Sequence, residues 1–144
     1  MLLLTDGSPN ALRAARTAAE MARVAQGEVL VVYVIPPVST LTRQTVSKGN
    51  ADLDDIVSAL RQAMQAGHEA LAQAANILAQ AGIACSVRLE QGVAATLVCQ
   101  IAQEEDCAAM VIGSADVDRA TVFAPGEAHR PPEGGAARSV VFVS

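Results

Sequence analysis

Aromatic residues are nearly absent from this sequence of 144 residues, where they make up 2% of positions and tryptophan does not occur. The core must therefore be built from Ala, Val, Leu and Ile, which supply most of the 51% hydrophobic content. Small aliphatic side chains of this kind suit helices packed closely against a parallel sheet. The length predicts one domain, residues 1–144, with room for a substantial core.

Basic residues are also scarce, and they are scattered. The net charge is −5, nine of the ten basic residues are arginine, and they form no run. A protein that binds nucleic acid needs a basic stripe or patch to neutralise phosphates. We therefore expect no nucleic-acid partner.

Cysteines and long apolar runs are few as well. Cys85, Cys99 and Cys107 show no CxxC or Cys/His spacing, which argues against structural disulfides and zinc and favours a reducing compartment. These three residues are expected to be small core side chains. The apolar start at Met1 is too short for a signal peptide, and no run approaches the roughly 20 residues of a membrane span. We expect a cytoplasmic protein without a membrane partner.

Short apolar runs alternate with helical patterns along the whole chain. Ser8 is a good N-cap and Pro9 suits the first helical position, while Gly27 is expected to end that helix in the left-handed region. A glycine in the middle of the long second helix, Gly67, predicts a kink or a break. The predicted strands are 2–4, 29–35, 83–89 (half exposed, at a sheet edge), 108–112 and 139–143; the predicted helices are 9–25, 51–80 and 94–105; and 38–50 and 114–138 are expected to be irregular.

This order of elements predicts an α/β fold: a five-stranded, parallel, doubly wound (Rossmann-like) sheet with helices on both faces. Ligands of such sheets bind beyond the carboxyl ends of the strands, where the strand order reverses. Asp6 and Gly113 both follow strands at such ends. They are therefore candidates for a ligand-binding crevice.

A strand that runs into Gly113-Ser114, with Gly126 thirteen residues after Gly113, is typical of a phosphate-binding loop. Glycine allows the backbone to approach an anion with its N–H groups. Asp116 and Glu127, however, occupy positions that would complete such a loop. The same segment therefore indicates a nucleotide-binding architecture and argues against tight binding of phosphate.

Taken together, these segments resemble the universal stress protein family, whose small α/β domains bind adenine nucleotides. The resemblance covers essentially the whole chain. It is carried by five segments in family order: Leu-Thr-Asp-Gly-Ser8, Val-Val-Tyr-Val-Ile-Pro-Pro37, Gln-Ala-Gly82, Glu-Gln-Gly92 and Met-Val-Ile-Gly-Ser114.

The resemblance implies a phosphate loop of the form Gly-x2-Gly-x9-Gly-Ser/Thr. Gly113 and Gly126 match its first and third glycines, whereas Asp116 replaces the second glycine and Glu127 replaces the Ser/Thr. A like charge about 4 Å from a phosphate costs ~1 kcal/mol in water and ~4 kcal/mol where it is partly shielded. Because ~1.4 kcal/mol is tenfold in affinity, the two acids should weaken binding by about ten- to a thousandfold.

The resemblance also implies an adenosine site and a final helix. Asp6 would lie near the adenosine, and Val34 and Ile112 would line the adenine and the backbone contacts. The family's helix before the last strand falls here on a segment with Pro131-Pro132, which disfavours a helix. We therefore expect that final helix to be missing or irregular.

Dimers paired through the last strand are frequent in the family, and the residues support one here. Val140, Val141, Phe142 and Val143 end the chain as a bare apolar strand, an edge that normally needs covering. Pairing with a second copy across a twofold axis would cover it. A homodimer paired through this strand is thus the expected assembly.

Two functions remain open. The first is a stress-response module with a degenerate ATP site, weak or no ATP binding, and action through dimerisation and protein partners. The second is a genuine ATP- or AMP-binding stress protein with slow hydrolysis, in which Mg²⁺ bridges Asp116 or Glu127 to phosphate. An enzyme or phosphoacceptor is disfavoured, because neither a GxGxxG motif nor an acidic pair follows the first strand.

Simpler structural interpretations also stand. Asp6 could serve only a strand-to-helix turn, and Gly113 only a tight turn. Glu104-Glu105-Asp106 reads as a solvated turn at a helix end, with a metal or partner contact as the alternative.

Overall fold

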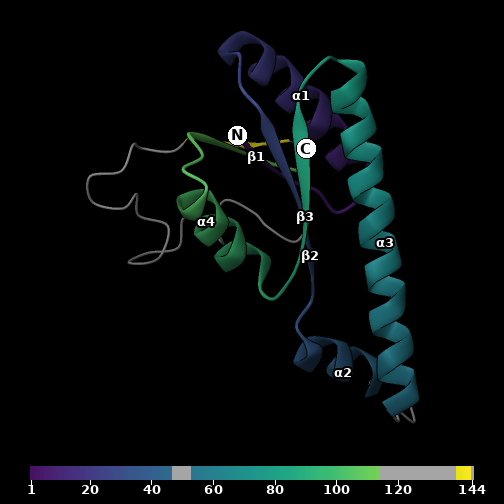
Figure 1. Ribbon diagram of the computed structural model, residues 1–144. Coiled ribbons are helices and arrows are strands. Elements are labelled where there is room, and N and C mark those ends of the chain that lie inside the picture. The colour runs from purple at the N-terminus through teal and green to yellow at the C-terminus, as the bar shows by residue number, and fades with distance from the viewer. Residues whose placement is uncertain (47–52, 114–138, 144) are drawn as a thin grey trace.

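The computed structural model describes residues 1–46, 53–113 and 139–143, which form a parallel sheet with helices on both faces (Figure 1). The sheet order is β3-β2-β1-β4-β5, so the first strand lies at the centre. The strands are β1 (Leu2–Leu4), β2 (Val29–Ile35), β3 (Cys85–Gln91), β4 (Ala109–Ile112) and β5 (Ser139–Phe142). The helices are α1 (Pro9–Ala25), α2 (Val38–Val46), α3 (Leu53–Gln80) and α4 (Ala94–Glu104). The predicted five-stranded doubly wound fold is confirmed.

The central strand shows why a continuous apolar run predicts a strand covered on both faces. Leu3 packs with α1 and α3, whereas Leu2 and Leu4 pack with α4 on the opposite face. All three side chains are buried. Because side chains alternate along a strand, a run with no polar residue has no face left for solvent.

The first helix, Pro9–Ala25, begins and ends as predicted, but its left-handed cap residue lies one position earlier than expected. Ser8 Oγ accepts a hydrogen bond from the Ala11 N–H at 3.2 Å, and Pro9 takes the first helical position. The left-handed residue is Gln26, with φ 54°, and the prediction of Gly27 was wrong. The Gly27 N–H instead donates to the Ala22 carbonyl at 2.9 Å, which closes the helix end in a Schellman arrangement.

The predicted loop over 38–50 is wrong for its first nine residues, which form α2. The Leu41 N–H donates to the Pro37 carbonyl at 3.0 Å, which starts the helix directly after the proline pair. Leu41 is buried, and α2 packs on α3. Tertiary contact thus stabilises a short helix whose Ser- and Thr-rich sequence has little helix propensity. The remaining positions of that prediction, 47–50, lie outside the described residues.

The predicted kink or break at Gly67 is also wrong, because α3 continues without interruption for 28 residues. A Cβ atom at Gly67 would lie 2.7 Å from Leu89 Cδ1 and 2.8 Å from Tyr33 Cδ1. The glycine therefore serves close packing of α3 on strands β2 and β3. The predicted start of this helix at residue 51 lies outside the described residues.

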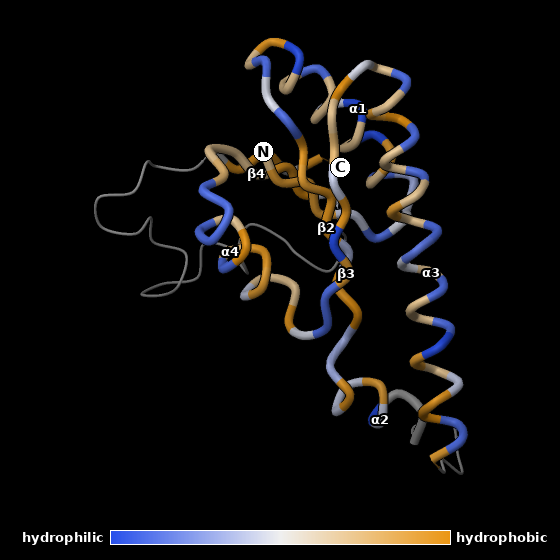
Figure 2. Tube along the Cα trace, in the orientation of Figure 1, coloured by the Kyte–Doolittle hydropathy of each residue, from blue (hydrophilic) through white to orange (hydrophobic). Residues whose placement is uncertain are grey.

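Both edges of the sheet were predicted from the sequence. The edge strand β3 begins at Cys85 and is half exposed as expected, with Val87 52% exposed. The other edge is β5, which pairs in parallel with β4. Between them the apolar residues gather on the sheet, while polar residues lie along the helices (Figure 2). The predicted irregular segment 114–138, with Pro131-Pro132, lies outside the described residues.

Candidate functional site

The strand order reverses between β1 and β4, where a doubly wound sheet opens its ligand crevice. The chain leaves the carboxyl end of β1 at Thr5 and that of β4 at Gly113. The Gly113 N–H donates to the Leu4 carbonyl at 3.1 Å, so the two strand ends lie side by side. The structure thus brings the carboxyl ends of these two strands together, as the sequence predicted.

Asp6 forms the turn at the mouth of this crevice. Its Oδ1 atom accepts a hydrogen bond from the Ser8 N–H at 2.9 Å, and Gly7 follows it with φ 80°. Thr5 Oγ1 accepts from the Gly7 N–H at 3.2 Å. A carboxylate that holds a turn in this way has a structural role, and Asp6 is half-buried.

Gly113 is required by close packing. A Cβ atom there would lie 2.6 Å from Ala14 Cβ and 2.8 Å from Ala11 Cα, both on the first turns of α1. Its φ does not lie in the left-handed region, so close packing against α1, and not a left-handed backbone, accounts for a glycine here. Ser8 Oγ reaches the Gly113 carbonyl at 3.5 Å and links the two sides of the crevice.

Val34 and Ile112 lie on the face of the sheet that α4 covers. Ile112 is 1% exposed, whereas Val34 is half buried. The register pairs Leu4 with Val32, so Val34 lies two residues beyond this pair, at the level of Asp6. The four described candidates therefore lie at or just beyond the carboxyl ends of three neighbouring strands, β2, β1 and β4. Gly126, Asp116 and Glu127 lie outside the described residues.

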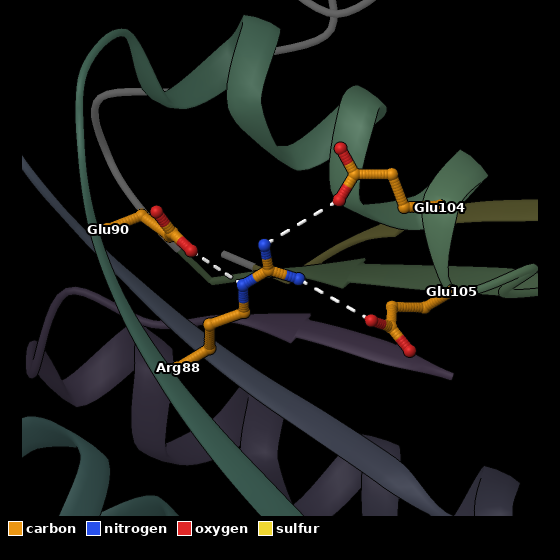
Figure 3. Close-up of polar contacts among 4 residues, drawn as sticks. All are labelled: Arg88, Glu90, Glu104 and Glu105. Carbon is orange, nitrogen blue, oxygen red and sulfur yellow. Dashed lines mark hydrogen bonds and ion pairs between the residues drawn. The ribbon is translucent and has the colours of Figure 1, made fainter.

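The sequence did not predict a charged cluster around Arg88 on β3 (Figure 3). Arg88 Nε lies 2.6 Å from Glu90 Oε1, and its terminal nitrogens lie 3.6 Å from Glu104 Oε2 and 3.5 Å from Glu105 Oε1. The hydrogen bond to Glu90 raises the pKa of the Arg88 guanidinium above its ordinary value, and the charges of the three carboxylates add to this. Glu104 and Glu105 are thus not merely solvated, because a cation offsets their charge at the C-terminal end of α4.

A polar pocket with a cavity volume of about 220 Å³ lies at the amino ends of the strands, on the side opposite the crevice. Met1, Glu28, Ser86, Glu105 and Cys107 line part of it. Its two carboxylates make it unsuited to a phosphate.

The described residues contain neither a cluster of metal ligands nor a membrane-spanning helix. Within 1–46, 53–113 and 139–143, no group of three or more His, Cys, Asp or Glu side chains is placed to hold a metal ion. Among the same residues, no helix combines the length and the apolar character needed to cross a bilayer.

The fold defines the class: an α/β protein with a doubly wound parallel sheet whose strand order reverses between β1 and β4. Within this class, the chain belongs to the universal stress protein family, whose sequence profile matches residues 1–122. The family resemblance stated from the sequence is therefore confirmed. A search of curated protein sequences found no match.

Solved structures support the fold. A universal stress protein family member from Burkholderia pseudomallei is 19% identical, with a TM-score of 0.71 and coverage of 99% of this chain and 94% of that one. A universal stress protein from Archaeoglobus fulgidus in complex with dAMP is 22% identical, with a TM-score of 0.63 and coverage of 99% and 95%. A family protein from Arabidopsis thaliana with AMP bound is 14% identical, with a TM-score of 0.60 and coverage of 99% and 90%.

Proposed function

We propose that this chain is a stress-response module that binds adenine nucleotides weakly or not at all and acts through dimerisation and protein partners. The observation that carries this proposal is the pair of acids, Asp116 and Glu127, at two of the four positions of the family's phosphate loop. Each acid replaces a neutral group and repels phosphate. On this proposal the protein is not an enzyme and needs no bound cofactor.

The packing around the crevice explains why the fold persists without a nucleotide. Gly113 is needed to seat α1, and the Asp6 carboxylate holds the turn that starts the same helix. Both residues would therefore be required in a protein that never binds phosphate. Their presence is no sign of retained affinity, whereas the acids at 116 and 127 indicate its loss.

The alternative is a genuine ATP- or AMP-binding protein, and the solved family structures in complex with dAMP and with AMP favour it. On this alternative, Asp6, Val34 and Ile112 would line the adenosine, Gly113 and Gly126 would hold phosphates, and Mg²⁺ would bridge the acids.

Calorimetric titration with adenosine, AMP and ATP, each with and without Mg²⁺, tests the proposal. Repulsion by the acids predicts that affinity falls as phosphates are added, so that ATP is the weakest ligand. Micromolar binding of ATP would contradict the proposal, and its loss on removal of Mg²⁺ would identify the bridged alternative.

A loop variant provides the complementary test. Asp116→Gly combined with Glu127→Ser restores the family pattern, and we expect it to strengthen ATP binding by about ten- to a thousandfold. Glu69→Ser with Asp55→Gly, which changes two exposed acids of α3, is the control of matched charge. Equal gains in the two variants would show that overall charge, and not the loop, sets the affinity.

A further inference from the structure

Helix α3 is longer than the sheet that it covers, and its first half extends past the sheet together with α2 (Figure 1). Residues 53–66 are called the α3 arm here. Apolar or small residues recur along the whole helix at alternating intervals of four and three: Leu53, Val57, Leu60, Met64, Gly67, Leu71, Ala74 and Leu78. This heptad pattern is the one by which helices pack against helices.

The two halves of this stripe have different surroundings. Gly67, Leu71, Ala74 and Leu78 are all buried in the domain. In the arm, by contrast, Leu53 is 73% exposed, Val57 37% and Met64 40%. Leu60, the fourth apolar residue of the arm, is half-buried, and α2 packs on α3. A stripe with one heptad period is thus covered in one half and largely open in the other.

The side of the helix on which the open half lies follows from its neighbours. Going back along the helix from residue 70 to 67, and from 67 to 64, turns the side-chain direction around the helix axis by about 60° each time, in the same sense. Ala70 faces Gly7 at the start of α1, and Gly67 faces Tyr33 and Leu89 on β2 and β3. The next step, to Met64, leads away from α1 toward the β3 edge. The open stripe therefore faces away from α1, toward the sheet edge opposite β5.

The charges beside the stripe are self-complementary. Asp54 and Arg61 follow the apolar residues Leu53 and Leu60 and occupy the same flank of the arm, one heptad apart. In a parallel pair, twofold symmetry would place each residue level with the same residue of the second copy. Asp54 would then lie beside Asp54, and Arg61 beside Arg61. An antiparallel pair instead sets Asp54 beside Arg61 twice.

We propose that a second copy of this chain packs antiparallel on the α3 arm. In this arrangement Val57 packs against Leu60 of the second copy, Leu53 packs against its Met64, and two Asp54–Arg61 ion pairs flank the apolar layers. A stable interface buries about 800 Å² per partner, more than these side chains supply alone, so the contact is weak by itself. Since β5 forms the opposite edge of the sheet, the two contacts together would join dimers into larger assemblies.

Sedimentation equilibrium tests the proposal. The protein carries Val141→Lys, which is chosen to block pairing through β5. If that variant does not fold, Val140→Lys replaces it. Concentrated protein is expected to associate reversibly. Arg61→Asp should raise the dissociation constant by about tenfold, and Asp54→Arg added to it should restore association. Arg16→Asp on α1 is the control of equal charge and should change nothing.

The apolar contacts are tested in the same background. Leu53→Ser should weaken association, whereas Val24→Ser should not, although Val24 is 87% exposed and equally apolar. A monomer at millimolar concentration would overturn the proposal, as would association that the charge swap fails to restore. Capture of a different protein by the arm, with no self-association, would also overturn it.

Discussion

At the scale of single residues, two glycines in this protein, Gly67 and Gly113, are required by the atoms that lie beside them. Gly67 allows strands β2 and β3 to approach α3, and Gly113 allows α1 to approach the end of β4. Gly27, in contrast, has nothing within 4 Å of an added Cβ. The same substitution should therefore have different effects at these positions.

Gly67→Ala is expected to destabilise the protein, although alanine is the better helix former by about 1 kcal/mol. The added methyl would meet Tyr33 and Leu89 at less than 3 Å, and overpacking of this kind costs about 1–3 kcal/mol. Urea unfolding monitored by circular dichroism measures the change. Gly27→Ala is the control and should leave the midpoint nearly unchanged. A stabilised Gly67→Ala variant would show that α3 can move away from the sheet.

At the scale of elements, Arg88 connects the edge strand β3 to the C-terminal end of α4. That helix end carries Glu104 and Glu105, whose charges oppose the helix dipole. The raised pKa of Arg88 means that its contribution is complete below its unfolded pKa and is lost only as the pH rises through the strongly alkaline range. The arginine therefore stays charged near neutral pH, and we expect its ion pairs to persist there.

Arg88→Met should loosen the end of α4 while changing global stability by no more than about 1 kcal/mol, because the Arg88 side chain is 33% exposed and solvent screens its pairs. Amide hydrogen exchange is expected to accelerate at residues 101–105. Added salt should reduce the difference from the unmodified protein. Arg13→Met, on the exposed side of α1, is the control. Unchanged exchange in α4 would show that the cluster does not hold the helix end.

At the scale of the whole molecule, the sheet ends in two edge strands that differ in chemistry. The β3 edge carries Arg88 and Glu90, whereas the β5 edge carries Val140 and Val141. Charged residues on an edge discourage pairing with another strand, and an apolar edge favours it. Between the two, β5 is the edge better suited to pair with a second copy.

Val141→Lys is expected to shift the protein toward monomer by placing a charge in that pairing. The side chain of Val141 lies against the apolar core on the face of the sheet that α1 covers, so a lysine there must extend its ammonium to solvent. Sedimentation velocity measures the assembly, and thermal unfolding of the same sample separates a lost interface from a lost fold. Val140→Lys, on the opposite face, should act in the same direction. A folded variant with an unchanged sedimentation coefficient would count against pairing through β5.

The sequence by itself determined the order of the strands, the positions of helices α1, α3 and α4, and both sheet edges. These features follow from local signals: unbroken apolar runs, the cap at Ser8, and alternation along the exposed strand. It also brought Asp6 and Gly113 together, because the carboxyl ends of neighbouring parallel strands meet at one edge of the sheet.

Only the tertiary structure decided α2, the continuity of α3 at Gly67, and the pairing of Arg88 with residues from α4. In each case the deciding interaction joins residues far apart in the chain. Leu41 is covered by α3, Gly67 meets side chains of two strands, and Arg88 reaches a helix end. The secondary-structure propensity of a segment depends only on residues close in the chain and does not include such contacts. Burial and ion pairing depend instead on which surfaces the fold brings together.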